Sequence, residues 1–208
     1  MDWIPFAAEK QRRYEEVHGE LDERGKVRRG NAAYAAALAL LMAGEPDAEE
    51  WFRRAAGAWR ASYEGGESWG RPVGIIKASL LAHDAAAVDE YARWTLGLGA
   101  ATSESTIGRY AGALALLALE RWPEARHVAE SLRGRDDFPH DVAEALATIA
   151  ASDLLDYVEA IDSVVASFET RDEFLEDARV ADTALVLQEL ATRRGIAQPL
   201  SPSPLLPR

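Results

Sequence analysis

The stretch Asn31–Tyr63 reads NAAYAAALALLMAG, EPD, AEEWFRRAAGAWRASY, and it decides the fold of this chain. Its first part is apolar on nearly every side, which is typical of a helix buried between neighbours. Gly44 and Pro46 interrupt the pattern, because glycine suits the end of a helix and proline suits the first turn of the next. In the last part, apolar and aromatic residues recur at helical spacing on one face. The stretch therefore predicts two helices joined by a short turn.

Three further helical pairs are predicted over residues 72–98, 103–134 and 138–168. They follow at intervals of roughly 31–41 residues, and a unit that recurs at such a spacing is the signature of stacked helical repeats. With helices before and after them, the pairs predict an all-α fold. We expect a right-handed stack of antiparallel helix pairs with about 9–10 helices.

Helix boundaries follow from capping residues. We expect the first helix to span residues 3–24 and to stop at Gly25, followed by a short basic link. Asp84 and Asp153 are expected to open later helices, because their short side chains can accept a hydrogen bond from the first turn. Thr170-Arg-Asp-Glu173 matches a capping box and predicts a further helical stretch.

The C-terminal segment IAQPLSPSPLLPR, residues 196–208, holds four of the nine prolines. Prolines at this density require an extended backbone near polyproline II. The segment is either a free tail or a strap packed across the final helix, and four apolar side chains favour the strap. These are Ile196, Leu200, Leu205 and Leu206. We therefore expect a single all-helical repeat domain over residues 1–195 and an extended proline-rich tail over 196–208.

The amino-acid composition restricts the kinds of partner that the chain can bind and its location in the cell. A net charge of −12 argues against duplex nucleic acid as a partner, because phosphate binding depends on clustered Lys and Arg. The same charge permits a basic protein partner, although acidic surfaces also simply keep proteins in solution. The chain has no cysteine, no leader pattern at its start and no apolar run that reaches membrane-spanning length. We therefore expect a cytoplasmic protein with no membrane contact.

The sequence contains no catalytic, cofactor-binding or metal-binding motif. It has no phosphate-binding glycine loop and no serine-hydrolase elbow, and none of its four histidines has HExxH spacing. His83-Asp84 and His140-Asp141 are adjacent pairs at expected helix starts, where capping explains the aspartates. We therefore predict no cofactor and no catalytic residue. The alternative is an enzyme on a helical scaffold that uses His83 or His140 with nearby carboxylates.

Three candidates for contact with a partner lie in an expected loop or at the start of a helix. Trp69 and Arg71 belong to the Gly-rich segment 64–72, which we expect to be a loop between repeats. Loops on rigid scaffolds often carry function, but Trp69 could equally fill space beneath the loop. Trp122 stands at the start of a helix and is the third candidate.

Four more candidates are carboxylates that recur every third residue. They are Asp153, Asp156, Glu159 and Asp162. Helical spacing puts them opposite the side that we expect to face the core. That inner side consists of Leu154, Leu155, Val158, Ile161, Val165 and Phe168. The carboxylates form either a solvated face or a surface that attracts a basic partner, and a metal site is the weaker reading.

The second helix of each pair resembles the B helix of tetratricopeptide repeats. In Ala48-Glu-Glu-Trp-Phe52-Arg-Arg-Ala55, an aromatic residue follows a small one by four positions and precedes another by three. Ala87…Tyr91…Trp94 matches in part, whereas residues 125–132 lack the aromatic residue, and the family's first-helix Trp and Leu-Gly are missing. The resemblance covers about residues 31–168 and implies a TPR-like α-α superhelix that binds proteins.

The C-terminal region carries a second resemblance. Residues 183–196 form an apolar helix that runs to Leu-Ala-x-x-Arg-Gly-Ile, and residues 203–207 join a serine to a Leu-Pro pair. This arrangement resembles the end of the all-helical immunity family numbered 49 of bacterial polymorphic toxin systems. The resemblance implies a protein that binds and neutralises a toxin, and the acidic charge would suit a basic toxin domain such as a nuclease.

These observations together predict a non-enzymatic protein–protein interaction module. It would act on a basic protein partner, with a toxin as the candidate, by steric and electrostatic occlusion. A further alternative is a structural subunit that buries its exposed helix faces in a homodimer.

Overall fold

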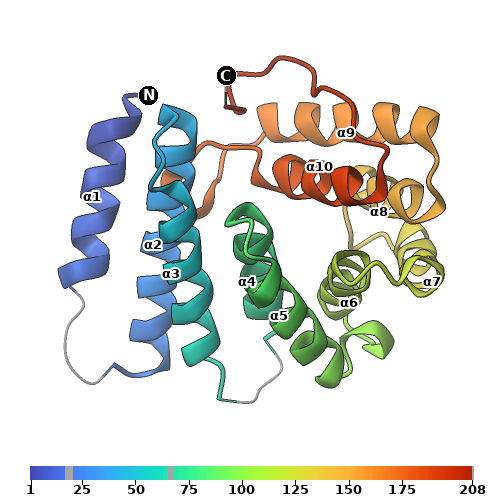
Figure 1. Cartoon of the computed structure of the whole chain (residues 1–208), viewed down its shortest axis with the longest axis horizontal. Helices are drawn as coiled ribbons and strands as arrows, with labels where there is room; N and C mark the ends of the chain where they lie inside the picture. The colour runs from blue at the N-terminus through green and yellow to red at the C-terminus, as the bar shows by residue number, and fades with distance from the viewer. Residues whose placement is uncertain (17–20, 65–67, 208) are drawn as a thin grey trace.

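The computed structural model describes residues 1–16, 21–64 and 68–207, and within these ranges the chain forms ten α-helices, two short 3-10 helices and no strand (Figure 1). The predicted all-α class is therefore confirmed. In chain order the α-helices are α1 (Trp3–Glu16), α2 (Glu23–Ala43), α3 (Ala48–Ala61), α4 (Gly70–Leu81), α5 (Ala85–Gly97), α6 (Thr106–Ala118), α7 (Trp122–Arg133), α8 (His140–Ala151), α9 (Leu154–Glu169) and α10 (Asp182–Arg194). The 3-10 helices are η1 (Ala100–Thr102) and η2 (Leu175–Asp177).

Helices that follow one another in the chain pack against one another, from α1 through α9. Contacts also join α4 to α6 and α6 to α8, so the first helices of successive pairs form one layer. The last helix, α10, contacts α4, α6, α8 and α9, and Figure 1 shows it (red) beside α9 (orange). The C-terminal helix is therefore part of the core of the stack.

The pair α2–α3 has the geometry expected from its sequence. Gly44 ends α2 with a φ of 73°, a left-handed conformation that glycine adopts without strain. Trp59 of α3 fills the space between α2 and α4, where a Cβ on Gly30 would lie 2.4 Å from the indole and one on Gly74 would lie 2.9 Å from it. These two glycines therefore allow three helices to approach around one indole.

The N-terminal region differs from the prediction. α1 and α2 are separate helices, so the single helix expected over residues 3–24, with its stop at Gly25, is wrong. Asp22 explains the difference, because its carboxylate accepts a hydrogen bond from Gly25 N (2.7 Å) and so caps the start of α2. The expected basic link, residues 26–29, consequently lies within α2.

The Gly-rich segment is helical at its C-terminal end. α4 begins at Gly70, so Arg71 lies in its first turn and its expected place in a loop is wrong. Pro72 also lies in the first turn, where proline is tolerated, which agrees with its expected place at a helix start. Gly65 and Gly66 lie outside the described residues.

Both aspartate caps are confirmed, and the capping box is wrong. The carboxylates of Asp84 and Asp153 each accept a hydrogen bond from the backbone N–H three residues on, at 3.0 and 3.3 Å. The hydroxyl of Thr170 instead donates to Ser167 O (3.0 Å). The chain then continues without an α-helix until Asp182.

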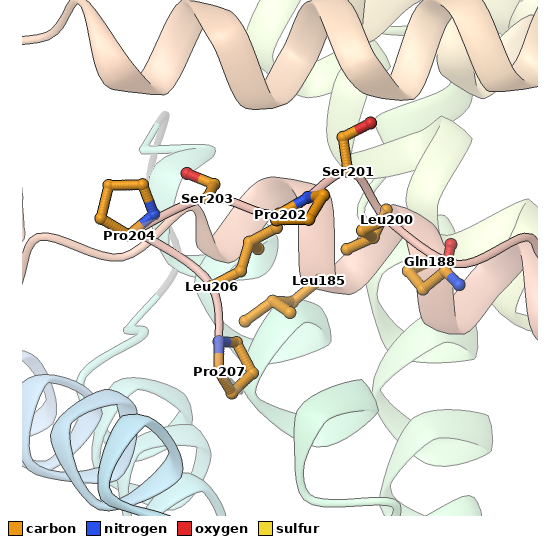
Figure 2. A pocket seen from close by; sticks show the side chains of 9 residues that line it. All are labelled: Leu185, Gln188, Leu200, Ser201, Pro202, Ser203, Pro204, Leu206 and Pro207. Carbon is orange, nitrogen blue, oxygen red and sulfur yellow. The ribbon is translucent and has the colours of Figure 1, made fainter.

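The C-terminal segment lies across α10 as a strap, the arrangement that its apolar residues favoured. Leu205 and Leu206 are buried, and Ala181 N donates to Leu205 O (2.9 Å). Figure 2 shows Leu206 beside Leu185 of α10 and Leu200 further along the same side of the strap. A largely apolar cavity of about 720 Å³ is lined by residues of both the strap and α10.

Candidate protein-binding face

α9 is held to the molecule by one stripe of its surface. The buried side chains of this stripe are Tyr157, Ala160, Ile161, Val164, Val165 and Phe168. The hydroxyl of Tyr157 donates to Gln188 Oε1 of α10 (2.8 Å), which fixes α9 against the last helix. Burial raises the pKa of Tyr157 well above its ordinary value, so the hydroxyl stays neutral and remains a donor.

Three apolar side chains of α9 face solvent. Leu155 has a relative exposure of 79%, Leu154 of 40% and Val158 of 36%. The expectation that they face the core is therefore wrong. A helix turns once every 3.6 residues, and the stripe centred on Tyr157 and Val164 leaves Leu155 on the opposite side. Fully burying a Leu side chain is worth about 1.5–3 kcal/mol, which this chain does not obtain from Leu155.

Carboxylates surround these apolar side chains. Asp153, Asp156 and Glu159 are exposed and Asp162 is half-buried. None of the four forms an ion pair with any residue in the described ranges, and α9 itself contains no Lys or Arg. The side of α9 that faces away from the core therefore exposes Leu155, and the carboxylates around this leucine have no cationic partner in the described chain.

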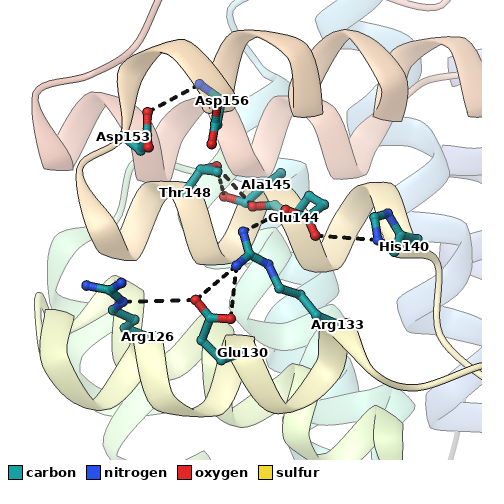
Figure 3. A network of polar contacts seen from close by, with 9 residues as sticks. All are labelled: Arg126, Glu130, Arg133, His140, Glu144, Ala145, Thr148, Asp153 and Asp156. Atoms are coloured by element: carbon teal, nitrogen blue, oxygen red, sulfur yellow. Dashed lines mark hydrogen bonds and ion pairs between the residues drawn. The ribbon is translucent and has the colours of Figure 1, made fainter.

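At the neighbouring contact between α7 and α8, by contrast, the acidic side chains are paired with basic ones (Figure 3). Arg133 of α7 contacts Glu130 at 2.9 Å and Glu144 of α8 at 2.6 Å. His140 Nε2 lies 3.4 Å from Glu144 Oε1, and Arg126 Nε lies 4.0 Å from Glu130 Oε1. Acidic groups at this contact have cationic partners, whereas those on α9 have none among the described residues.

A groove of about 660 Å³ lies between α8 and α9. Its lining includes Asp141 and Glu144 from α8 and Asp156 and Glu159 from α9. The Oδ2 atom of Asp141 is buried and has no hydrogen-bond partner in the part of the chain that the structure describes. A guanidinium or ammonium group in the groove would meet the unpaired carboxylates of Asp156 and Glu159.

We use the term α9 face for this groove together with the seven residues beside it. They are Asp153, Leu154, Leu155, Asp156, Val158, Glu159 and Asp162. The four acidic candidates predicted from the sequence thus share one surface. The exposed apolar residues between them were missed, although the adjacent leucines of Leu154-Leu155 signal that a helix cannot bury both on a narrow stripe.

The two candidates at the start of α4 are engaged within the molecule. A Cβ on Gly108 of α6 would lie 2.9 Å from Trp69 Cε2, so the Trp69 ring packs against α6. Arg71 Nη1 lies 2.6 Å from Glu23 Oε1 and donates to Ser62 O (2.7 Å). Trp69 is therefore a packing residue, and Arg71 joins the starts of α2 and α4 to the end of α3.

Trp122, the first residue of α7, is half-buried. The guanidinium of Arg194 from α10 lies 4.6 Å from the centroid of its ring, a cation–π contact. Trp122 therefore links α7 to the C-terminal helix.

The two histidines of the enzyme alternative have different carboxylate neighbours. His83 Nδ1 lies 3.7 Å from Glu189 Oε2, whereas His140 contacts Glu144, and both side chains are largely exposed. Among the described residues, no group of three or more His, Cys, Asp or Glu side chains could hold a metal ion. None of the described helices combines the length and the apolar character that crossing a membrane requires.

Comparison with protein-family models, with curated proteins and with solved structures gave no match to this chain. The function of this chain is therefore inferred from the geometry and chemistry of the α9 face.

Proposed function

We propose that this chain is a non-enzymatic protein-binding module that binds a basic protein through the α9 face. The observation that carries the proposal is the exposure of Leu154, Leu155 and Val158 among carboxylates without ion-pair partners in the described chain. Apolar side chains at the centre of a polar, charged surface are the usual composition of a binding interface.

The chemistry of the face defines the partner. A basic protein would place Lys or Arg beside Asp156 and Glu159 and in the groove near Asp141, and an apolar side chain over Leu155. The net charge of −12 would also accelerate the encounter with such a partner. Burying the exposed leucines would supply affinity, and the carboxylates would supply specificity and rate.

A homodimer through the same face is disfavoured by its charge. A two-fold interface brings the same patch of each copy together, so Asp153, Asp156 and Glu159 would face their own counterparts. Like charges placed opposite one another oppose association. The α9 face therefore fits a partner of opposite charge better than a second copy.

The same proposal covers the superhelical arrangement of the helix pairs, the cellular location and the identity of the partner. Four helical pairs and the buried small–aromatic–small set Ala48, Phe52 and Ala55 support a right-handed TPR-like superhelix. The absence of cysteine from the sequence supports a cytoplasmic location. The C-terminal resemblance adds that the basic partner is a toxin domain, which the bound α9 face would occlude sterically and electrostatically.

Affinity purification from the native host tests this proposal. The wild-type chain should retain one stoichiometric protein with a basic surface, and that protein should be lost from the triple variant Leu155→Ser, Asp156→Asn, Glu159→Gln. The control is Glu49→Gln, Glu50→Gln on the exposed face of α3, because it removes two carboxylates as the α9 variant does. Equal recovery by the α9 variant, or recovery of an acidic protein, would contradict the proposal.

A further inference from the structure

A second, largely apolar cavity lies between α2, α3, α4 and the start of α10. Its volume is about 400 Å³. α2 contributes Val27, Asn31 and Tyr34, which occupy one face of that helix at i, i+4 and i+7. α4 contributes Gly70, Gly74 and Lys77 at the same kind of spacing. The cavity therefore runs along both helices, and the Trp59 ring packs against Gly74 in its wall.

Arg71 and Lys77 are the two cationic residues of the lining. They are six residues apart on α4, which corresponds to about 9 Å along the helix axis at 1.5 Å per residue. Val27 and Val73 also line the cavity, and Leu175 of η2, which is 44% exposed, lies at its rim. The lining thus combines two cations with several apolar side chains.

The acceptor groups in this cavity already have donors. Asp182 Oδ2 lies 2.6 Å from Lys77 Nζ and accepts a hydrogen bond from the Tyr34 hydroxyl (2.8 Å). Burial first, and then the Asp182 carboxylate, hold the pKa of Tyr34 well above its ordinary value, so this hydroxyl stays a donor. Asn31 Oδ1 accepts from Trp59 Nε1 (3.0 Å).

Several donor groups, in contrast, remain available. An indole N–H can only donate, so the contact with Trp59 fixes the Asn31 amide with its NH₂ group turned away from that contact. Arg71 engages Glu23 and Ser62 through Nη1, and its Nε and Nη2 make no hydrogen bond to the described part of the chain. The cavity is therefore suited to a ligand that presents an acceptor.

Charge balance disfavours a ligand that carries more than one negative charge. Each cation of the lining has one carboxylate partner, Arg71 with Glu23 and Lys77 with Asp182, so these four groups carry no net charge. A carboxylate accepts charge-assisted hydrogen bonds, which are roughly twice as strong as neutral ones. A phosphate monoester would bring two negative charges into this neutral lining, whereas a carboxylate brings only one.

We propose that this cavity binds a small organic carboxylic acid, with its carboxylate on Arg71 and Asn31 and its apolar body over Gly74. Val27, Val73 and Leu175 cover the apolar body. The site is separate from the α9 face and does not depend on the proposed protein partner.

Titration of the full chain with 3-phenylpropanoate tests the proposal, with the six indole N–H signals as the readout in a ¹H–¹⁵N spectrum. The Trp59 signal, assigned with Trp59→Phe, should shift and saturate at about 1 mM ligand or below. The matched neutral amide, 3-phenylpropanamide, and the dianion 2-phenylethyl phosphate should each bind at least tenfold more weakly. A Trp59 signal that is unchanged at about 10 mM acid, or equal binding of the amide or the phosphate, would overturn the proposal.

Variants locate the site. Arg71→Gln should weaken binding at least tenfold, whereas Arg93→Gln, which makes the same charge change in an exposed ion pair of α5, should leave it unchanged. Val27→Trp fills the cavity without removing a polar contact, and it should abolish the Trp59 shift while the chain stays folded by circular dichroism. Unchanged binding by Val27→Trp would place the acid elsewhere and overturn the proposal even if Arg71→Gln fails to fold.

Discussion

Lys77 Nζ lies 2.6 Å from Asp182 Oδ2, and this ion pair joins α4 to the first residue of α10. Both side chains are largely buried, with relative exposures of 12% and 17%. Tyr34 donates to the same carboxylate oxygen, and Lys77 also donates to Thr183 Oγ1 (3.1 Å). The C-terminal helix is therefore fixed to the stack by a hydrogen-bonded charge pair between segments that are distant in sequence.

Asp182→Ala should lower the free energy of unfolding by about 3 kcal/mol, because it leaves a buried ammonium without its counterion. The double variant Lys77→Met, Asp182→Ala should lose clearly less, since no uncompensated charge remains. Urea unfolding of the three proteins measures both effects. Equal losses in the single and double variants would show that the pair is not coupled.

Substitution of glycine by alanine should change the stability of the protein in opposite directions at two positions. A Cβ on Gly112 of α6 would lie 2.6 Å from backbone atoms of Ala101, so Gly112→Ala should destabilise the protein by about 1–3 kcal/mol. Nothing lies within 4 Å of a Cβ on Gly57 in the middle of α3, so Gly57→Ala should stabilise it by about 0.5–1 kcal/mol. Thermal unfolding of both variants checks the packing around α6, and a stabilising Gly112→Ala would disagree with the position of η1.

The loop between α7 and α8 should contribute a pH-dependent part of the stability. The Arg135 guanidinium, and then the Thr106 hydroxyl, lower the pKa of Asp137 to about 2. Because an unfolded aspartate titrates near about 3.9, the stabilisation is present above that pH and is lost as the pH falls through about 2. Asp137→Asn should therefore be less stable than wild type at neutral pH, and the difference should vanish towards pH 2.

The control for this loop is Asp136→Asn, which changes an exposed neighbour of Asp137. It should track the wild type across the same pH range. An NMR titration of the Asp137 carboxyl that gave an ordinary midpoint would refute the contact with Arg135.

The strap should stabilise the protein through its buried leucines. Leu206 is buried beside Leu185, so Leu206→Ala should lower the free energy of unfolding by about 2 kcal/mol. Ser201→Ala, at an exposed position of the same strap, should change it by less than about 0.5 kcal/mol. Chemical denaturation of the two variants distinguishes a packed strap from a free tail, for which both effects would be small.

Local chemistry made much of the architecture predictable. The N-caps at Asp84 and Asp153, and the glycine that ends α2 at Gly44, depend on residues close in sequence, and the structure has all three. The break before α2 was missed because Gly25 is a familiar stop signal. In the folded chain Gly25 N instead donates to the Asp22 cap and so begins a helix.

Long-range contacts limit what the sequence can predict. α10 begins at Asp182, whose carboxylate contacts Lys77 and Tyr34, and no local signal announces these partners. The orientation of α9 also depends on its neighbours, because Tyr157 turns towards Gln188 of α10 and so leaves Leu155 in solvent. The acidic half of the candidate site was therefore predictable, and its apolar half was not.

The most direct test of the proposed function is the affinity of the purified partner for defined α9 variants, measured by isothermal titration calorimetry at low and high salt. Leu155→Ser should weaken binding at least tenfold, which corresponds to about 1.4 kcal/mol. Asp156→Asn with Glu159→Gln should weaken binding and reduce its salt dependence, whereas Glu49→Gln with Glu50→Gln should change neither. Wild-type affinity for Leu155→Ser and for the α9 double variant would contradict the assignment of this face as the binding surface.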